Sequence, residues 1–89
     1  LDIPVPGMNI TDQYLFSSLN HIYEGRYDLA IQKSSLVLEL EPENVLALKR
    51  LGSAYFAIGR KEKAIETWQR ALKISPNDKE IKDYVSQVK

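Results

Sequence analysis

Apolar residues recur along this chain every three or four positions, the spacing that places side chains on one face of a helix. In the first such stretch they are Tyr14, Leu15, Leu19 and Ile22, and a Gly-Arg pair then interrupts the pattern. The pattern resumes, stops before a proline, and the same succession follows a second time before a shorter closing stretch. The spacing therefore predicts five helices, at about residues 11–24, 27–40, 45–58, 61–74 and 77–88.

Glycine and proline mark the ends of these predicted helices. Gly25 and Gly59 follow the first helix of each pair, where the chain needs a positive φ that costs glycine little. Pro42 and Pro76 follow the second helix of each pair. Because proline does not fit a helix interior but suits a connection or a first turn, the second helices should end before these prolines.

The two helix pairs are copies of one unit. When the chain is shifted by 34 residues, residues 11–44 fall onto 45–78 with six identities. Glycine, alanine and proline are among them, and their backbone and packing requirements are strict, so the match is not a chance one. The six pairs are Gly25/Gly59, Arg26/Arg60, Ala30/Ala64, Ile31/Ile65, Leu38/Leu72 and Pro42/Pro76.

The second unit resembles a tetratricopeptide repeat, a family whose helix–turn–helix has this length and this order of bulky, small, aromatic and proline positions. The matching residues are Leu48, Leu51, Gly52, Tyr55, Gly59, Ala64, Trp68, Ala71 and Pro76. The first unit is degenerate but keeps the register. It departs from the second with Ser17 and Ser18 for Leu51 and Gly52, His21 for Tyr55, and Ser34 for Trp68.

The resemblance covers about residues 11–89 and implies an all-α fold, a right-handed superhelix of antiparallel helix hairpins. We divide the chain into repeats at 11–44 and 45–78 and a cap helix within 77–89. For residues 1–10 we expect an extended arm or the remnant of a linker, because two X-Pro steps favour extended backbone. The family serves unrelated pathways as an interaction scaffold, so the resemblance names no partner.

The last predicted helix has the pattern of a cap. Its apolar stripe is Ile81, Tyr84, Val85 and Val88, and its polar positions are Lys82, Ser86 and Lys89. The stripe should pack on the second unit, whereas the polar positions stand where a further helix would pack. We therefore expect this helix to close the array, with Ser75 and Asp78 forming a capping box at its start.

Composition excludes several classes of function. The 89 residues carry twelve basic and twelve acidic side chains, which does not fit the clustered positive charge of a nucleic-acid binder. No apolar run approaches the roughly 20 residues of a membrane-spanning helix. The chain has no cysteine, so disulfides, thiolate metal sites and thiol catalysis are excluded.

The sequence contains little that indicates catalysis. His21 is the only histidine and should be a packing residue, and the serine pairs lack the Gly-x-Ser-x-Gly context of a nucleophile. Glu39, Glu41 and Glu43 should form a solvated turn. We therefore assign no catalytic residue, cofactor or metal ligand, although a buried polar pocket at His21 would favour the alternative of a ligand-binding or enzyme-associated regulatory domain.

The resemblance implies that ligands bind on the inner face of the first helices. There we expect an apolar concave groove for a peptide, a partner helix or a second copy of the chain, and the first ten residues are a further candidate to fill it. The expected groove residues are Leu15, Leu19, Ile22, Tyr23, Lys49, Arg50, Ser53 and Phe56. Leu46, Glu80 and Tyr84 should lie on the same face. Because only Lys49 and Arg50 are basic, we expect no clamp for a terminal carboxylate. The alternative to a binding groove is that neighbouring helices simply bury the apolar residues of this face.

Overall fold

The computed structural model of this chain describes residue 7 and residues 9–88, and within them it contains five α-helices and no strand. The helices are α1 (Ile10–Tyr23), α2 (Tyr27–Leu40), α3 (Val45–Ala57), α4 (Lys61–Ile74) and α5 (Lys79–Val88). The predicted all-α fold is confirmed. Most of the predicted arm, residues 1–10, and Lys89 of the predicted cap lie outside the described residues.

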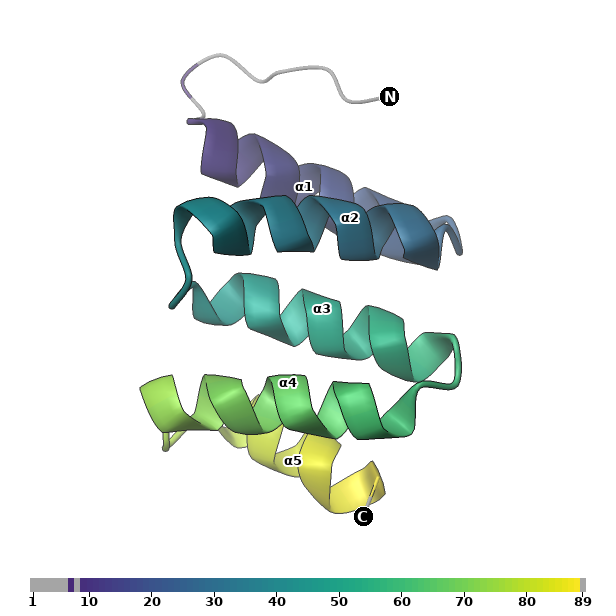
Figure 1. Cartoon of the computed structure of the whole chain (residues 1–89), viewed down its shortest axis with the longest axis vertical. Helices are drawn as coiled ribbons and strands as arrows, with labels where there is room; N and C mark the ends of the chain where they lie inside the picture. Colours follow the sequence, from purple (N-terminus) through teal and green to yellow (C-terminus); the bar gives the residue numbers. More distant parts are fainter. Residues whose placement is uncertain (1–6, 8, 89) are drawn as a thin grey trace.

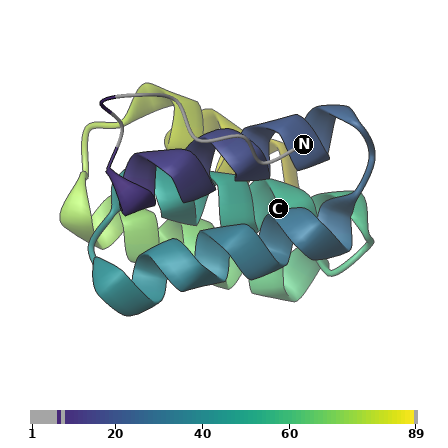
Figure 2. The same ribbon diagram turned by 90° about the horizontal axis from the view of Figure 1, so that it is seen from above.

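The five helices stack in chain order along the long axis of the molecule (Figure 1). Each helix packs on the next, and α1 also contacts α3. Seen from above, α1 and α5 lie on one side of the stack, while α2 and α4 lie on the other (Figure 2). The first helices of the units therefore share one face of the molecule, and α5 extends that face.

The two helix–helix turns have the same hydrogen-bonded geometry. Gly25 has φ +76° and Gly59 has φ +84°, a conformation that disfavours any residue with a Cβ. In the first turn the Gly25 N–H donates to the Ile22 carbonyl at 3.1 Å and the Arg26 N–H donates to the His21 carbonyl at 2.8 Å. This pair of bonds is the Schellman arrangement, and it satisfies carbonyls that the helix end leaves without partners.

An asparagine or aspartate caps the start of α1, α3 and α5. The side chains of Asn9, Asn44 and Asp78 each accept from the backbone N–H three residues later, at 2.8, 2.9 and 3.1 Å. The predicted capping box is wrong, because Ser75 is the C-cap of α4 and Asp78 alone is the N-cap residue. The turn that contains Pro76 delays the start of α5 to Lys79, instead of residue 77.

The larger core cluster joins α3, α4 and α5, and the buried Trp68 is its largest side chain. Its buried members are Leu48, Ala64, Trp68, Ala71, Ile81 and Val85, with Tyr84 and Val88 packed against them. The predicted stripe of α5 thus packs on the second unit, while Lys82 and Ser86 are exposed. Leu15, Val37 and Ala47 form a smaller cluster between α1, α2 and α3.

Candidate functional site

Side chains of α1, α3 and α5 line a shallow depression on the shared face, with a volume of about 310 Å³. We call it the concave groove. Its lining residues are Leu19, Ile22 and Tyr23 from α1, Leu46, Lys49, Arg50 and Ser53 from α3, and Glu80 and Tyr84 from α5. Every one of them was expected on this inner face, because the repeat register fixes which side of each first helix faces inward.

Two of the eight residues predicted for the groove do not line it. Leu15 is only 7% exposed and packs with Val37 and Ala47, so its placement in a binding strip is wrong. For this residue the alternative of burial by neighbouring helices is correct. Phe56 is exposed, but its ring lies beside Trp68 with the ring centroids 6.1 Å apart, outside the set of lining residues.

Charged groups share the groove with the apolar side chains. Tyr23 is 79% exposed and Leu46 is 43% exposed, whereas Leu19 and Ile22 are half-buried. Lys49, Arg50 and Glu80 stand among these residues. A ligand in the groove would therefore meet both apolar surface and fixed charge.

Lys49 ties α3 to the start of α5. Its Nζ lies 2.9 Å from the Asp78 carboxylate and 3.3 Å from that of Glu80. The hydrogen bond from Lys49 holds the pKa of Asp78 below its ordinary value, and the same bond raises the pKa of Lys49. Lys49 therefore lies in the groove as expected, but two carboxylates already pair with its charge.

Arg50 differs from Lys49 in its partners. Its guanidinium donates to the backbone carbonyl of Leu15 and so links α3 to α1. Among the described residues no carboxylate oxygen lies within 4.0 Å of it. Burial lowers the pKa of Arg50, an effect that Tyr23 partly opposes. Arg50 is therefore a half-buried cation without an acidic partner in this part of the chain.

Aromatic rings support the α5 wall of the groove. The Tyr84 ring lies 5.1 Å from the Trp68 ring, centroid to centroid, and burial raises the pKa of its hydroxyl. Trp68 itself lies against Gly52, where an added Cβ would sit 2.3 Å from the indole nitrogen. Glycine is needed at this position because the ring occupies the space of a side chain.

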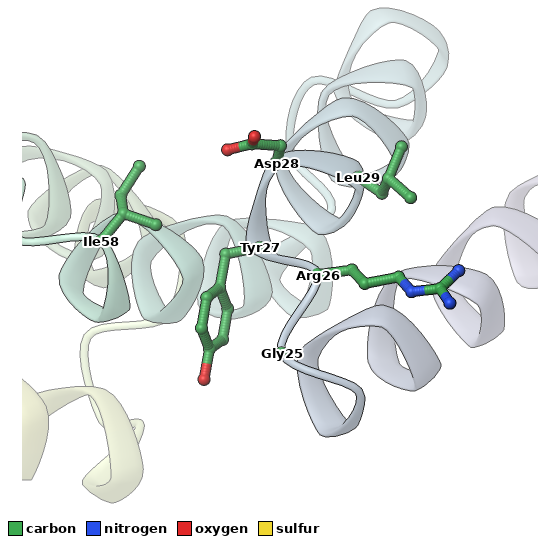
Figure 3. Close-up of a pocket in the computed structure, with 6 residues that line it drawn as sticks. All are labelled: Gly25, Arg26, Tyr27, Asp28, Leu29 and Ile58. Atoms are coloured by element: carbon green, nitrogen blue, oxygen red, sulfur yellow. The ribbon is translucent and has the colours of Figure 1, made fainter.

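A second depression, which the sequence did not indicate, lies at the first helix–helix turn. This turn hollow has a volume of about 350 Å³ and is lined by residues 25–29 and Ile58. In Figure 3, Tyr27 and Asp28 point toward the side of Ile58, while Arg26 and Leu29 point the other way. The side chains therefore do not converge on one point. The signal that could have revealed the hollow is the pair of apolar residues Leu29 and Ile58 beside a turn, both of them exposed.

The remaining candidates for chemistry are structural. His21 is buried in α1, with Nδ1 3.6 Å from the Glu24 carboxylate. Glu41, expected in a solvated turn, accepts hydrogen bonds from Thr11 at 2.6 Å and from Asn44 at 3.0 Å. These bonds lower the pKa of Glu41. Across the described residues no three acidic or histidine side chains form a group that could hold a metal ion, and no helix has the length and apolarity of a membrane span.

A family model described as "Tetratricopeptide repeat" matches residues 45–78 of the chain. The chain is a tetratricopeptide-repeat protein. The matched residues are α3, α4 and the turns beside them, and α1 and α2 form a second hairpin with the same turn geometry. The groove therefore lies on the face formed by α1, by α3, which is the first helix of the matched tetratricopeptide repeat, and by α5.

The chain is also similar to parts of longer curated proteins. The FK506-binding protein-like of Mus musculus is 33% identical over 89 residues, which are 99% of this chain and 26% of that protein. Outer envelope protein 61 of Arabidopsis thaliana is 33% identical over 69 residues, 78% of this chain and 12% of that protein. Small glutamine-rich tetratricopeptide repeat-containing protein 2 of Mycosarcoma maydis is 31% identical over 58 residues, 65% of this chain and 16% of that protein. The chain thus spans about a quarter or less of the length of these relatives.

Proposed function

We propose that this tetratricopeptide domain is a non-catalytic interaction module that binds an apolar segment of a partner protein in the concave groove. Tetratricopeptide repeats generally mediate protein–protein interaction, and a groove on the face of their first helices suits that role. The partner segment, a peptide or one face of a helix, would lie across α1, α3 and α5.

The observation that carries the proposal is that exposed and half-buried apolar side chains from two first helices line the same depression. Tyr23 and Leu46 are exposed on α1 and α3, and the half-buried Leu19 and Ile22 line the same groove. Contiguous exposed apolar surface of this kind usually marks an interaction site. At roughly 25 cal/mol per Å² of buried apolar area, covering a few such side chains supplies several kcal/mol before the costs of ordering.

The proposal is tested by selecting a displayed library of random peptides on the intact chain. We expect enrichment of peptides with several apolar residues, and we expect Leu46→Glu to weaken their binding by at least about tenfold, because it places a charge among the apolar contacts. Circular dichroism should remain helical, since Leu46 is exposed in the first turn of α3.

Leu29→Glu is the matched control. Leu29 also stands in the first turn of a helix and is 38% exposed, close to the 43% of Leu46, but it lies at the turn hollow. A helix N-terminus accepts the new carboxylate equally well in both variants. If Leu46→Glu binds the selected peptides normally and Leu29→Glu does not, then the peptides bind at the turn hollow. That result would contradict the proposal.

The competing occupant is a second copy of the chain. Sedimentation velocity over a range of concentrations distinguishes it from a separate partner. If the wild-type chain associates with itself, and Leu46→Glu but not Leu29→Glu abolishes the association, then the groove is a surface between copies and no separate partner need be sought.

A further inference from the structure

The charges of the concave groove are not equally satisfied. Lys49 lies within hydrogen-bonding distance of two carboxylates, those of Asp78 and Glu80. The Glu80 carboxylate also helps to raise the pKa of the Tyr84 hydroxyl. The charged groups on the α5 side of the groove therefore already pair with one another. A ligand would gain little by replacing one of these pairs with its own contact.

Arg50, which faces the α1 side, is in the opposite situation. Its one hydrogen-bond acceptor in the described part of the chain is the neutral carbonyl of Leu15, which leaves other N–H donors of the guanidinium uncommitted. The group is already half-buried, and burial lowers the pKa of Arg50. An apolar segment that covered the groove would desolvate this cation further, at a cost that only a paired anion removes.

We propose that Arg50 makes the groove selective for partner segments in which an aspartate or glutamate stands among the apolar residues, the carboxylate pairing with the guanidinium. The apolar side chains of the segment would contact Leu19, Ile22 and Leu46. Its carboxylate would accept hydrogen bonds from the N–H groups of Arg50 that do not donate to the Leu15 carbonyl. This inference rests on the proposed function, since it specifies the ligand of the same groove.

A carboxylate fits this site better than a phosphate group. Recognition of a phosphorylated side chain generally uses several basic groups together. Within the groove the only other cation is Lys49, and it is held by Asp78 and Glu80. A single guanidinium with one edge on a carbonyl matches one carboxylate in both charge and number of donors.

The test selects a displayed library of random peptides on the wild-type chain and on Arg50→Gln. Glutamine keeps an N–H donor for the Leu15 carbonyl but removes the charge. We expect the wild-type chain to enrich peptides that carry an acidic residue between apolar ones, and Arg50→Gln to enrich apolar peptides without that preference. Arg60→Gln removes one positive charge from an exposed arginine outside the groove and should behave as the wild type.

A synthesised peptide pair then measures the effect. The acidic residue of an enriched peptide is replaced by its amide, which should weaken binding to the wild-type chain by about tenfold and to Arg50→Gln by less than about twofold. If Arg50→Gln does not fold, the wild-type chain alone decides the question. The NMR signal of the Arg50 side-chain Nε–H should then shift with the acidic peptide and not with its amide counterpart.

The outcomes separate the two proposals. If no peptide binds the wild-type chain better than it binds Leu46→Glu, the proposed function fails. If peptides bind the groove but show no acidic preference, or if the amide peptide binds as well as the acidic one, only the role of Arg50 is overturned. An acidic preference that persists unchanged in Arg50→Gln likewise overturns it.

Discussion

The two helix hairpins fill the same crossing point in different ways. In the second hairpin the Trp68 indole packs directly on Gly52, inside the larger core cluster. In the first hairpin the equivalent residues are Ser18 and Ser34, and their hydroxyl oxygens lie 2.7 Å apart, fully buried. One crossing is held by a large apolar surface and the other by a buried hydrogen bond between small side chains.

The comparison separates the features that both hairpins share from the side chains that differ where their helices cross. Both hairpins share the glycine turn with its positive φ, and both bury the alanine near the start of the second helix, Ala30 or Ala64. These features set how closely the helices pack, so the crossing itself accepts either solution. The second hairpin buries more apolar surface there and also supports α5, so it should contribute more to the stability of the domain.

The largest expected effect is that of Trp68→Ala, which removes the side chain that distinguishes the second hairpin. Truncating a buried aromatic residue costs about 3–5 kcal/mol of unfolding free energy. Urea denaturation monitored by circular dichroism measures the loss. A cost below about 1 kcal/mol would mean that the second crossing is no more important than the first.

Gly52→Ala tests the same crossing from the other helix. An added Cβ would sit 2.3 Å from the indole nitrogen of Trp68, so the ring must move, at a cost of about 1–3 kcal/mol for overpacking. In the Trp68→Ala background the clash disappears, and Gly52→Ala should then be neutral or stabilising, because alanine favours the helix. Additive losses in the double variant would show that the two residues do not share this space.

Ser34→Ala is the corresponding change in the first hairpin and should cost less, about 1–2 kcal/mol. The loss arises because the Ala30 carbonyl, at 3.5 Å, is then the one hydrogen-bond partner left to the Ser18 hydroxyl among the described residues. Replacing both serines by alanine removes donor and acceptor together, so the double variant should be no less stable than Ser34→Ala alone. The same denaturation experiment decides whether the hydrogen bond, and not the small volume of serine, holds this crossing.

Much of the fold and part of the groove follow from the repeat register. Gly25, Gly59, Pro42 and Pro76 mark helix ends because their backbone preferences act locally, whatever the rest of the chain does. The register also places six of the eight predicted side chains around the groove, since it determines which side of each first helix faces inward.

The remaining features depend on neighbours that a single helix pattern does not reveal. Leu15 and Lys49 occupy the same register position, yet Leu15 packs into the core and Lys49 pairs with Asp78 and Glu80. The difference lies in what stands opposite each of them, which is known only once the helices are stacked. The turn hollow was missed for the same reason, because Ile58 comes to line the hollow beside residues 25–29 only when α2 packs on α3.

The smallest expected effect concerns the two loops that lead into first helices, where Asn44 caps α3 and Asp78 caps α5. Asp78→Asn gives the second loop the cap of the first: it should keep the bond to the Ile81 N–H but lose the charge that pairs with Lys49. Because the pKa of Asp78 is lowered in the folded chain, its carboxylate stabilises the fold above the unfolded-state value, about pH 4, and this contribution is lost as pH falls through the lowered pKa. Lys49, whose pKa is raised, titrates only in the alkaline range and leaves this acid window unchanged. Between neutral and acid pH, the unfolding temperature of Asp78→Asn should therefore depend less on pH than that of the wild type. The difference between the two unfolding temperatures should shrink toward zero once Asp78 is protonated in the wild type.

Glu41→Gln is the matched control at the other loop, where the pKa of Glu41 is also lowered. It should also make the unfolding temperature less dependent on acid pH, but it leaves the pair of Lys49 and Asp78 intact. If the unfolding temperature of Asp78→Asn and that of the wild type fall equally toward acid pH, then the charge of Asp78 adds nothing to stability. Asp78 would in that case act only as a helix cap, as Asn44 does.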